Sequence, residues 1–350
     1  MHLVHEGVGV HVKNQVIDFV IPWVDGNDSA WLSEKNKYLQ ELEKDTYGSF
    51  WIDAGDNRYR DWGNLHYWFR AVEKYAPWVN RIHLIVWRDV PDWLQTEHPK
   101  LHIVRHADYI PADCLPVFSS HPIELNMHRI PGLAEQFVYF NDDMFLAAPV
   151  KPTDFFVDGL PCDSVSERPN FAGGFFQCIC LNNIAYINRH FSRMTVRKTH
   201  KRKWFTLRCP RDLIKNLMFI WLKRDCFFGF TSHHLPQPFL KSTFEEMWKL
   251  EPELLEETSK HRFRNARDVN QYIFRFHQFM TGKFYPYCIS VRGRVYGSND
   301  DCAHITKNIL KQKYQRICVN DNEQVDFELV KGHLNAAFEK MLPEKCSFEK

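Results

Sequence analysis

The sequence has 350 residues, which is enough for one elaborated domain or for two closely packed ones. Charged residues make up 25% of it and hydrophobic residues 44%, so the composition excludes an intrinsically disordered chain. A formal net charge of +2 excludes a globally basic protein of the kind that binds nucleic acid.

The sequence also lacks the marks of secretion and of membrane insertion. No apolar run is long enough to span a bilayer, and residues 1–15 contain no apolar core or cleavage site of a signal peptide. The ten cysteines include no C-x-x-C pair, which favours free thiols over a zinc site. We therefore expect a cytoplasmic protein.

The first half of the sequence alternates strand-like and helix-like segments. Continuous apolar runs predict strands at residues 17–24, 81–87, 100–106 and 136–140. Between the first two strands, residues 64–76 place their apolar side chains at helical spacing. This order predicts a mainly parallel sheet that helices cover on both faces.

Polar clusters follow the first and the last of these strands. Asp25 and Asp28 come directly after the first, and Asn141, Asp142 and Asp143 come directly after the last. Asn and Asp are common in ordinary turns. Ligands of such sheets, however, bind at the carboxyl ends of the strands, so a metal or phosphate site at this edge is the alternative.

Residues 119–133 lead into the last of these strands. Within them, Glu124 and His128 are four residues apart and would share one face if the segment were helical. They could then form a structural ion pair or a set of ligands close to the Asn141–Asp143 cluster.

The second half of the sequence, from residue 151 onward, is predicted to be rich in helices. Ser242 and Glu245 match the capping box of a helix. Pro252 is expected to break or restart that helix, and Asp268 is expected to cap the next one. No low-complexity linker separates the two halves, so we expect them to share one core or a tight cleft.

Two segments of this half carry candidate chemistry. His234 lies in a loop that Pro236 and Pro238 stiffen, which suits a positioned general base, although many loop histidines are merely solvated. Arg264 lies in an arginine-rich run at residues 261–268. Its guanidinium fork matches phosphate oxygens, and a solvated helix end is the alternative.

Residues 197–203, Arg-Lys-Thr-His-Lys-Arg-Lys, form a local basic run. Such a run is most often a solvated face. The alternative is a surface that attracts an anionic substrate or an anionic membrane.

Four ordered blocks of the sequence resemble the Stealth family of bacterial capsular polysaccharide phosphotransferases, which are D-hexose-1-phosphate transferases related to GlcNAc-1-phosphotransferase. The blocks are residues 17–28, residues 58–87 together with 115–146, residues 229–278, and residues 317–322 together with the C-terminal tail. They span nearly the whole chain. The sequence departs from the family pattern at Trp62 and at residues 231–233.

The resemblance implies a Rossmann-like, glycosyltransferase-A-like α/β fold with a mainly parallel sheet. Residues 1–150 would form the half that binds a nucleotide-sugar, and residues 151–350 a helix-rich half that completes the catalytic cleft. The implied reaction moves a sugar 1-phosphate from a nucleotide-sugar, a UDP-linked hexose or N-acetylhexosamine, to a hydroxyl of a glycan, and it releases a nucleoside monophosphate.

The resemblance also implies roles for particular residues. Asp142 and Asp143 would hold Mg²⁺ or Mn²⁺ or lie against the diphosphate. His234 would be the general base or, alternatively, a nucleophile, and Glu124 would orient the metal or the sugar. The residues implied to clamp phosphate, to contact the nucleotide or donor sugar, or to complete the cleft are Arg264, Arg60, Asp25, Gly26, Asp28, Asp61, Asn64, Asn320 and Asp321.

Two other functions stay open at this point. A metal-dependent glycosyltransferase would also place carboxylates after a strand, but it would release a nucleoside diphosphate. A non-catalytic sugar-binding or scaffold protein of capsule assembly would need no metal. The family also implies a glycan or lipid-linked glycan acceptor, and with it peripheral contact with the inner face of the membrane and with capsule-assembly proteins.

Overall fold

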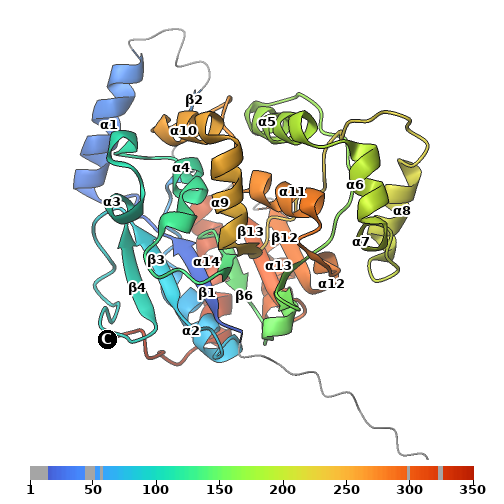
Figure 1. Cartoon of the computed structure of the whole chain (residues 1–350). Helices are drawn as coiled ribbons and strands as arrows, with labels where there is room; N and C mark the ends of the chain where they lie inside the picture. Colours follow the sequence, from blue (N-terminus) through green and yellow to red (C-terminus); the bar gives the residue numbers. More distant parts are fainter. Residues whose placement is uncertain (1–14, 44–51, 56–57, 298–299, 322–325) are drawn as a thin grey trace, which may run out of the picture.

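The protein is described here from a computed structural model, shown in Figure 1. It describes residues 15–43, 52–55, 58–297, 300–321 and 326–350. Within these ranges, no helix is both long enough and apolar enough to cross a membrane. All ten cysteines are free thiols; five of them are buried, and the other five, Cys178 and Cys180 included, are only half-buried.

A five-stranded sheet forms the centre of the molecule, in the order β4-β3-β1-β5-β9. Its strands are β1 (Ile17–Pro22), β3 (Ile82–Val86), β4 (Leu101–Arg105), β5 (Gln136–Tyr139) and β9 (Gln237–Leu240). The first four run parallel, and only β9 at the edge is antiparallel. The four predicted strands and the mainly parallel sheet are therefore confirmed.

Alternate residues of β1 enter two different hydrophobic cores. Phe19 and Ile21 belong to a core with α2 (Leu65–Tyr75) and α14 (Phe327–Met341). Val20 belongs to a core with α9 (Lys241–Leu250) and α11 (Tyr272–Thr281). Because successive side chains of a strand point to opposite faces, this division confirms that helices cover both faces of the sheet.

A second sheet joins the two halves of the chain. It has the order β12-β13-β6, with β12 (Gly293–Gly297), β13 (Arg316–Asn320) and β6 (Met144–Leu146). β6 lies directly after the Asn141–Asp143 cluster and pairs with β13 from the C-terminal part. Both sheets therefore contain strands from before and after residue 150.

Helices and short strands surround these two sheets, and in Figure 1 α6, α7 and α8 lie together at one end of the molecule. The other elements are α1 (Ser29–Glu43), β2 (Ile52–Asp53), α3 (His106–Tyr109), α4 (Ser120–Leu125), β7 (Phe156–Val157), β8 (Leu160–Asp163), α5 (Phe175–His190), α6 (Arg193–Thr199), α7 (Lys201–Trp204), α8 (Pro210–Met218), α10 (Pro252–Lys260), β10 (Arg264–Asn265), β11 (Tyr285–Pro286), α12 (Ile289–Arg292) and α13 (Cys302–Leu310).

The predicted helix caps of the second half are wrong. α9 begins at Lys241, and the Ser242 hydroxyl donates to Glu135 rather than capping the helix. Asp268 precedes α11 by several residues, and its carboxylate accepts a hydrogen bond from the Asn265 amide at 2.9 Å instead of capping the helix. Pro252 opens α10, so the expected restart is confirmed.

Candidate functional site

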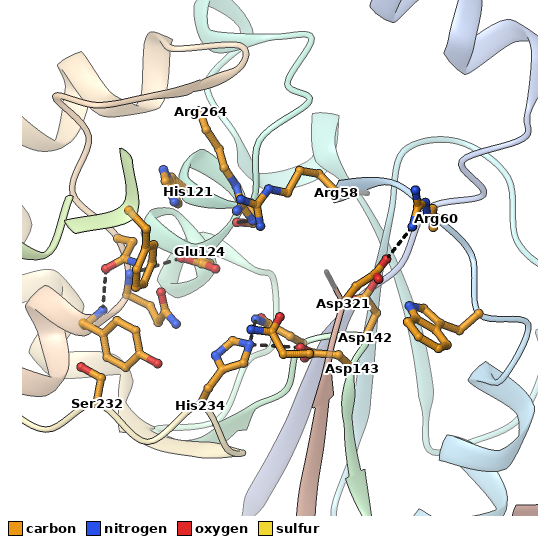
Figure 2. A pocket seen from close by; sticks show the side chains of 18 residues that line it. Arg58, Arg60, His121, Glu124, Asp142, Asp143, Ser232, His234, Arg264 and Asp321 are labelled. Atoms are coloured by element: carbon orange, nitrogen blue, oxygen red, sulfur yellow. Dashed lines mark hydrogen bonds and ion pairs between the residues drawn. The ribbon is translucent and has the colours of Figure 1, made fainter. Parts of the chain in front are cut away.

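A cavity of about 420 Å³ opens at the carboxyl edge of the central sheet, and Figure 2 shows the side chains that line it. Segments from both halves of the chain form its walls. Among the lining residues are Arg58, Arg60, Glu124, Asn141, Asp142, Asp143, His234, Arg264, Asn320 and Asp321. All except Arg58 and Asn141 belong to the implied site residues.

The floor of the cavity is the Asn141–Asp143 turn, which joins β5 to β6. The Met144 amide donates to the Asn141 carbonyl at 3.0 Å, so the segment is a tight turn as well as a polar site. Shielding from bulk water by the cavity walls, together with repulsion from Asp143, raises the pKa of Asp142. Two adjacent carboxylates at this position thus favour a bound cation.

His234 and Asp143 form a histidine–carboxylate pair on this floor. The His234 Nε2 lies 3.2 Å from the Asp143 Oδ2, and the Cys318 thiol also donates to that oxygen at 3.2 Å. Burial would lower the pKa of His234, but the charge and the hydrogen bond of Asp143 outweigh it and raise that pKa. Burial would conversely raise the pKa of Asp143, and His234 lowers it. The pair therefore stabilises an imidazolium beside a carboxylate.

The oxygen atoms of this floor fit a hard divalent cation. The Asp143 Oδ1 is buried and accepts no hydrogen bond from any residue that the structure describes. Mg²⁺ and Mn²⁺ prefer carboxylate oxygens, and a metal that also binds a diphosphate takes only one or two of them from the protein. Ligand atoms of Asp143, His234 and Cys318 also lie within 4.8 Å of one another. Because burial raises the pKa of the Cys318 thiol well above its ordinary value, the carboxylates are the better ligands.

Arginine side chains form the wall opposite the floor. In Figure 2, Arg264 and Arg58 point toward one another across the upper side of the cavity. Arg264 donates to the Ser120 hydroxyl at 3.1 Å, and Arg58 pairs with Asp53 at 2.7 Å. Arg60 lies 3.6 Å from Asp321. Two guanidinium groups that face each other favour an anion between them, and phosphate oxygens match their geometry.

Sequence reasoning missed Arg58, although a signal for it was present. Arg58 and Arg60 are two residues apart in an irregular segment before α2. Both belong to the same short Arg-Tyr-Arg run, and both side chains line the cavity. The implied role of Arg60 could therefore have been extended to Arg58.

Glu124 lies buried behind the cavity floor. It accepts hydrogen bonds from the Tyr139 hydroxyl at 3.1 Å and from the Gln271 amide at 3.3 Å, and burial raises its pKa. The prediction that it shares a helical face with His128 is wrong, because α4 ends at Leu125. His128 instead packs its ring against Trp248, with 5.6 Å between ring centroids.

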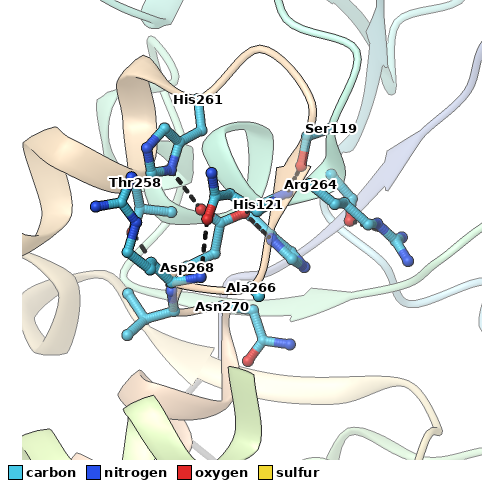
Figure 3. A network of polar contacts seen from close by, with 12 residues as sticks. Ser119, His121, Thr258, His261, Arg264, Ala266, Asp268 and Asn270 are labelled. Atoms are coloured by element: carbon cyan, nitrogen blue, oxygen red, sulfur yellow. Dashed lines mark hydrogen bonds and ion pairs between the residues drawn. The ribbon is translucent and has the colours of Figure 1, made fainter. Parts of the chain in front are cut away.

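A cluster of one aspartate and two histidines borders the same cavity, and Figure 3 shows it. The His121 Nδ1 lies 2.7 Å from one oxygen of Asp268, and the His261 Nδ1 lies 2.6 Å from the other. Burial would raise the pKa of Asp268, but the hydrogen bonds from the two imidazoles lower it. His121 lines the cavity and was not predicted, although it lies only three residues before Glu124.

The residues after β1 do not line the main cavity. Asp25 and Asp28 border a neighbouring pocket with residues 87–92, and Asp28 also caps α1 by accepting from the Trp31 amide at 2.7 Å. Asp61 and Asn64 border a small pocket that they share with Asp142. The structure thus connects Asp61 and Asn64 to the cavity floor and places Asp25 and Asp28 farther along the same sheet edge.

Replacing Gly26 with alanine is expected to destabilise the fold by about 1–3 kcal/mol. A Cβ atom at Gly26 would lie 1.8 Å from the backbone oxygen of Tyr59, so one of the two segments must move. Urea unfolding would measure the loss. Gly332→Ala is the control, because nothing lies within 4 Å of that position on α14. An equal loss in both variants would contradict this contact.

Replacing Arg275 with leucine is expected to destabilise the fold by about 3–5 kcal/mol, because Asp163 would stay buried without its cation. The Arg275 guanidinium binds both oxygens of Asp163, at 2.7 and 2.8 Å, and it donates to the Thr231 carbonyl at 2.9 Å. The pair is fully buried and holds the loop that leads to His234.

Lys283→Ala serves as the control for this change, because its ion pair with Glu246 is partly exposed to solvent. An exposed pair contributes less than about 1 kcal/mol. Similar shifts of the urea midpoint in the two variants would show that the buried pair contributes no more to stability than the Lys283–Glu246 pair.

Three conserved regions of the Stealth proteins match this chain. Region 1 matches residues 15–43, region 2 residues 58–162 and region 3 residues 233–282. The capsular polysaccharide phosphotransferase WcwK of Streptococcus pneumoniae is 39% identical over 343 residues, which cover 97% of this chain and all of that protein. The chain belongs to the Stealth family. It is an enzyme, a phosphotransferase.

Two further relatives of this Stealth protein have similar lengths. The receptor polysaccharide phosphotransferase WefC of Streptococcus gordonii is 40% identical, over 95% of this chain and 98% of that protein. The exopolysaccharide phosphotransferase cps2G of Lactiplantibacillus plantarum is 37% identical, over 95% of this chain and 96% of that protein. Among solved structures, the galactosyltransferase LgtC is similar at 9% identity and a TM-score of 0.40, over 94% of this chain and 98% of that one.

Proposed function

We propose that this Stealth protein transfers a sugar 1-phosphate from a nucleotide-sugar to a hydroxyl group of a glycan. The observation that carries the proposal is one cavity in which arginines face two adjacent carboxylates, Asp142 and Asp143. Asp143 is also hydrogen-bonded to His234. Such a cavity offers charge for a diphosphate and a base for a hydroxyl proton. The names of its relatives favour an acceptor in capsular polysaccharide or exopolysaccharide. A free or lipid-linked glycan as the acceptor belongs to the same proposal.

The proposed step is a displacement at the β-phosphorus of the donor. The acceptor oxygen forms a bond to this phosphorus, and the bond from phosphorus to the oxygen that bridges it to the α-phosphate breaks. The sugar and its phosphate leave together as a phosphodiester of the acceptor, and the nucleoside monophosphate takes the bridging oxygen. The anomeric carbon keeps its bond to oxygen throughout.

His234 is the proposed base for the acceptor hydroxyl. Its Nε2 is held by Asp143, and no hydrogen bond to its Nδ1 is found in the described part of the chain, so Nδ1 is the nitrogen left for the hydroxyl. The carboxylate makes the neutral imidazole more basic and fixes its orientation. A nucleophilic role, with phosphate carried briefly on His234, is the alternative within the same geometry.

The remaining residues would bind and orient the two substrates. Arg264, Arg58 and Arg60 would hold the phosphate oxygens. A divalent cation bound by Asp142 and Asp143 would neutralise charge on the diphosphate. The residues proposed to orient the donor sugar, to contact the nucleotide or to close the cleft are Glu124, Asp61, Asn64, Asn320, Asp321, Asp25, Gly26 and Asp28. The cytoplasmic location belongs to the same proposal.

The released nucleotide tests this proposal. Purified protein would be incubated with UDP-linked hexoses and N-acetylhexosamines, Mg²⁺ or Mn²⁺, and a glycan acceptor, and the nucleotide product would be identified by chromatography. We expect a nucleoside monophosphate whose release requires both metal and acceptor. Release of a nucleoside diphosphate would instead identify a glycosyltransferase, and absence of turnover with every donor would favour a binding protein.

A further inference from the structure

α8 is amphipathic in the opposite sense to an ordinary surface helix. Its polar residues Asp212 and Asn216 are buried, whereas Ile214, Leu217 and Met218 are exposed. The Asn216 side chain donates to the carbonyls of two residues beneath the helix, and it accepts from the Glu167 amide at 2.9 Å. The polar face of the helix is therefore anchored to the protein, and its apolar face is exposed on the surface.

The apolar surface continues beyond the end of the helix. Ile220, Trp221 and Leu222 are exposed, and Trp221 keeps 86% of its surface accessible. Large apolar side chains gathered in this way on the surface mark an interaction site. We refer to these three residues together with Ile214, Leu217 and Met218 as the α8 surface.

Hydrogen bonds from buried side chains hold the backbone of this surface in place. The guanidinium of Arg193 donates to the Phe219 carbonyl at 2.7 Å and to the Leu222 carbonyl at 3.0 Å. Arg197 donates to the Asn216 carbonyl at 3.1 Å. Both arginines are buried, and both pair with the buried Glu167. The exposure of the apolar side chains is thus a property of the folded state.

The segment that contains the α8 surface is rich in positive charge. Residues 193–225 contain eleven Lys and Arg residues and two acidic residues, the buried Asp212 and the exposed Asp225, although the whole chain has a net charge of only +2. The exposed cations of this stretch are Lys198, Lys201, Arg202, Arg208, Arg211, Lys215, Lys223 and Arg224. The basic run at 197–203 contributes only in part, because Arg197 is buried and Lys203 donates to the Gly282 and Phe284 carbonyls.

We propose that the α8 surface docks this protein on an anionic lipid bilayer. Apolar side chains that include a tryptophan, accompanied by Lys and Arg, are the combination that inserts into the interface of a membrane and binds its anionic headgroups. A second copy of the chain fits less well, because the same positive charge would face itself across a symmetric contact. The proposal does not depend on the reaction proposed above.

Co-flotation of the full chain with vesicles tests this docking. We expect binding to vesicles of phosphatidylcholine that contain phosphatidylglycerol, little binding to phosphatidylcholine alone, and loss of binding in high salt. Met218→Ser combined with Trp221→Ser, and Arg211→Glu combined with Lys215→Glu, should each weaken binding about tenfold or more. Turnover with a soluble acceptor should stay unchanged in both, which separates this test from that of the reaction.

Two controls carry the same chemical changes elsewhere on the surface. Leu329→Ser removes an exposed apolar side chain from α14, and Lys249→Glu reverses an exposed charge on α9. Neither should change vesicle binding. The proposal is overturned if the wild type fails to float with anionic vesicles, if the controls weaken binding equally, or if sedimentation shows a dimer that the Met218→Ser, Trp221→Ser variant dissociates.

Discussion

Replacing His234 with alanine is expected to lower kcat by about 10²- to 10⁴-fold, the usual contribution of a positioned general base. The fold should be retained, because this histidine is partly exposed to the cavity and its side-chain partners are only the neighbouring Asp143, at 3.2 Å, and Asn141, at 3.4 Å. The loss would be measured as the rate of nucleotide release from one nucleotide-sugar donor. Binding of the donor should change much less, since the proposed base acts on the acceptor hydroxyl.

The matched control is a second histidine–carboxylate pair outside the cavity. The His190 Nε2 lies 2.5 Å from Glu251 near the surface. His190→Ala removes the same side chain and a comparable hydrogen bond, and it should leave kcat within about twofold of the wild type. Near-normal turnover of His234→Ala, or equal losses in the two variants, would remove His234 from the mechanism.

Replacing Asp143 with asparagine is expected to cause a loss of similar size, about 10²- to 10⁴-fold in kcat, because it removes the group that orients the base. The pH profile gives a sharper readout. Asp143 raises the pKa of His234, and the base works in its neutral form, so activity of the wild type should rise with pH as His234 loses its proton. Without the carboxylate this pKa falls, and the acidic limb of kcat/KM should move to lower pH.

Glu251→Gln is the control for this second change, since it neutralises the carboxylate of the His190 pair. Its pH profile should coincide with that of the wild type. If the acidic limb of Asp143→Asn stays in place or moves to higher pH, Asp143 does not set the pKa of the catalytic base. A loss that excess Mg²⁺ or Mn²⁺ restores would show that the metal contact of Asp143, and not its effect on His234, accounts for the loss.

The sequence was sufficient to predict the features that depend on short-range patterns. Buried parallel strands are apolar runs, so β1, β3 and β5 could be located from the sequence pattern, and the half-buried edge strand β4 from its shorter apolar stretch. Since their carboxyl ends share one edge, the Asn141–Asp143 turn could be expected to face a ligand. The structure adds that this segment is a turn and a candidate site at once.

Features that depend on tertiary contacts could not be predicted in this way. Asp268 has the sequence position of a helix cap, but two histidines distant from each other in sequence bind it instead, His121 and His261. The Ser242 hydroxyl likewise donates to Glu135 of the neighbouring segment and does not cap its helix. Local propensity competes with such contacts and is commonly overridden by them.

The basic run at residues 197–203 shows the same limit. Its composition indicates an exposed charged face, but Arg197 is buried under α8 and bonds backbone carbonyls there. The apolar residues of α8 have the same spacing as those of a helix that faces the core. The sequence pattern therefore does not show that they are exposed. Only the burial of Asp212 and Asn216 shows that this helix faces outward with its apolar side.

The fate of the β-phosphorus tests the proposed reaction most directly. A nucleotide-sugar radiolabelled at that atom would be incubated with the enzyme, metal and a glycan acceptor, and the glycan would be separated from the released nucleotide. Transfer of a sugar 1-phosphate predicts that the label appears in the glycan, in a phosphodiester that alkaline phosphatase cannot hydrolyse. Label that stays with the released nucleotide, while the sugar moves to the glycan, would contradict the proposed function.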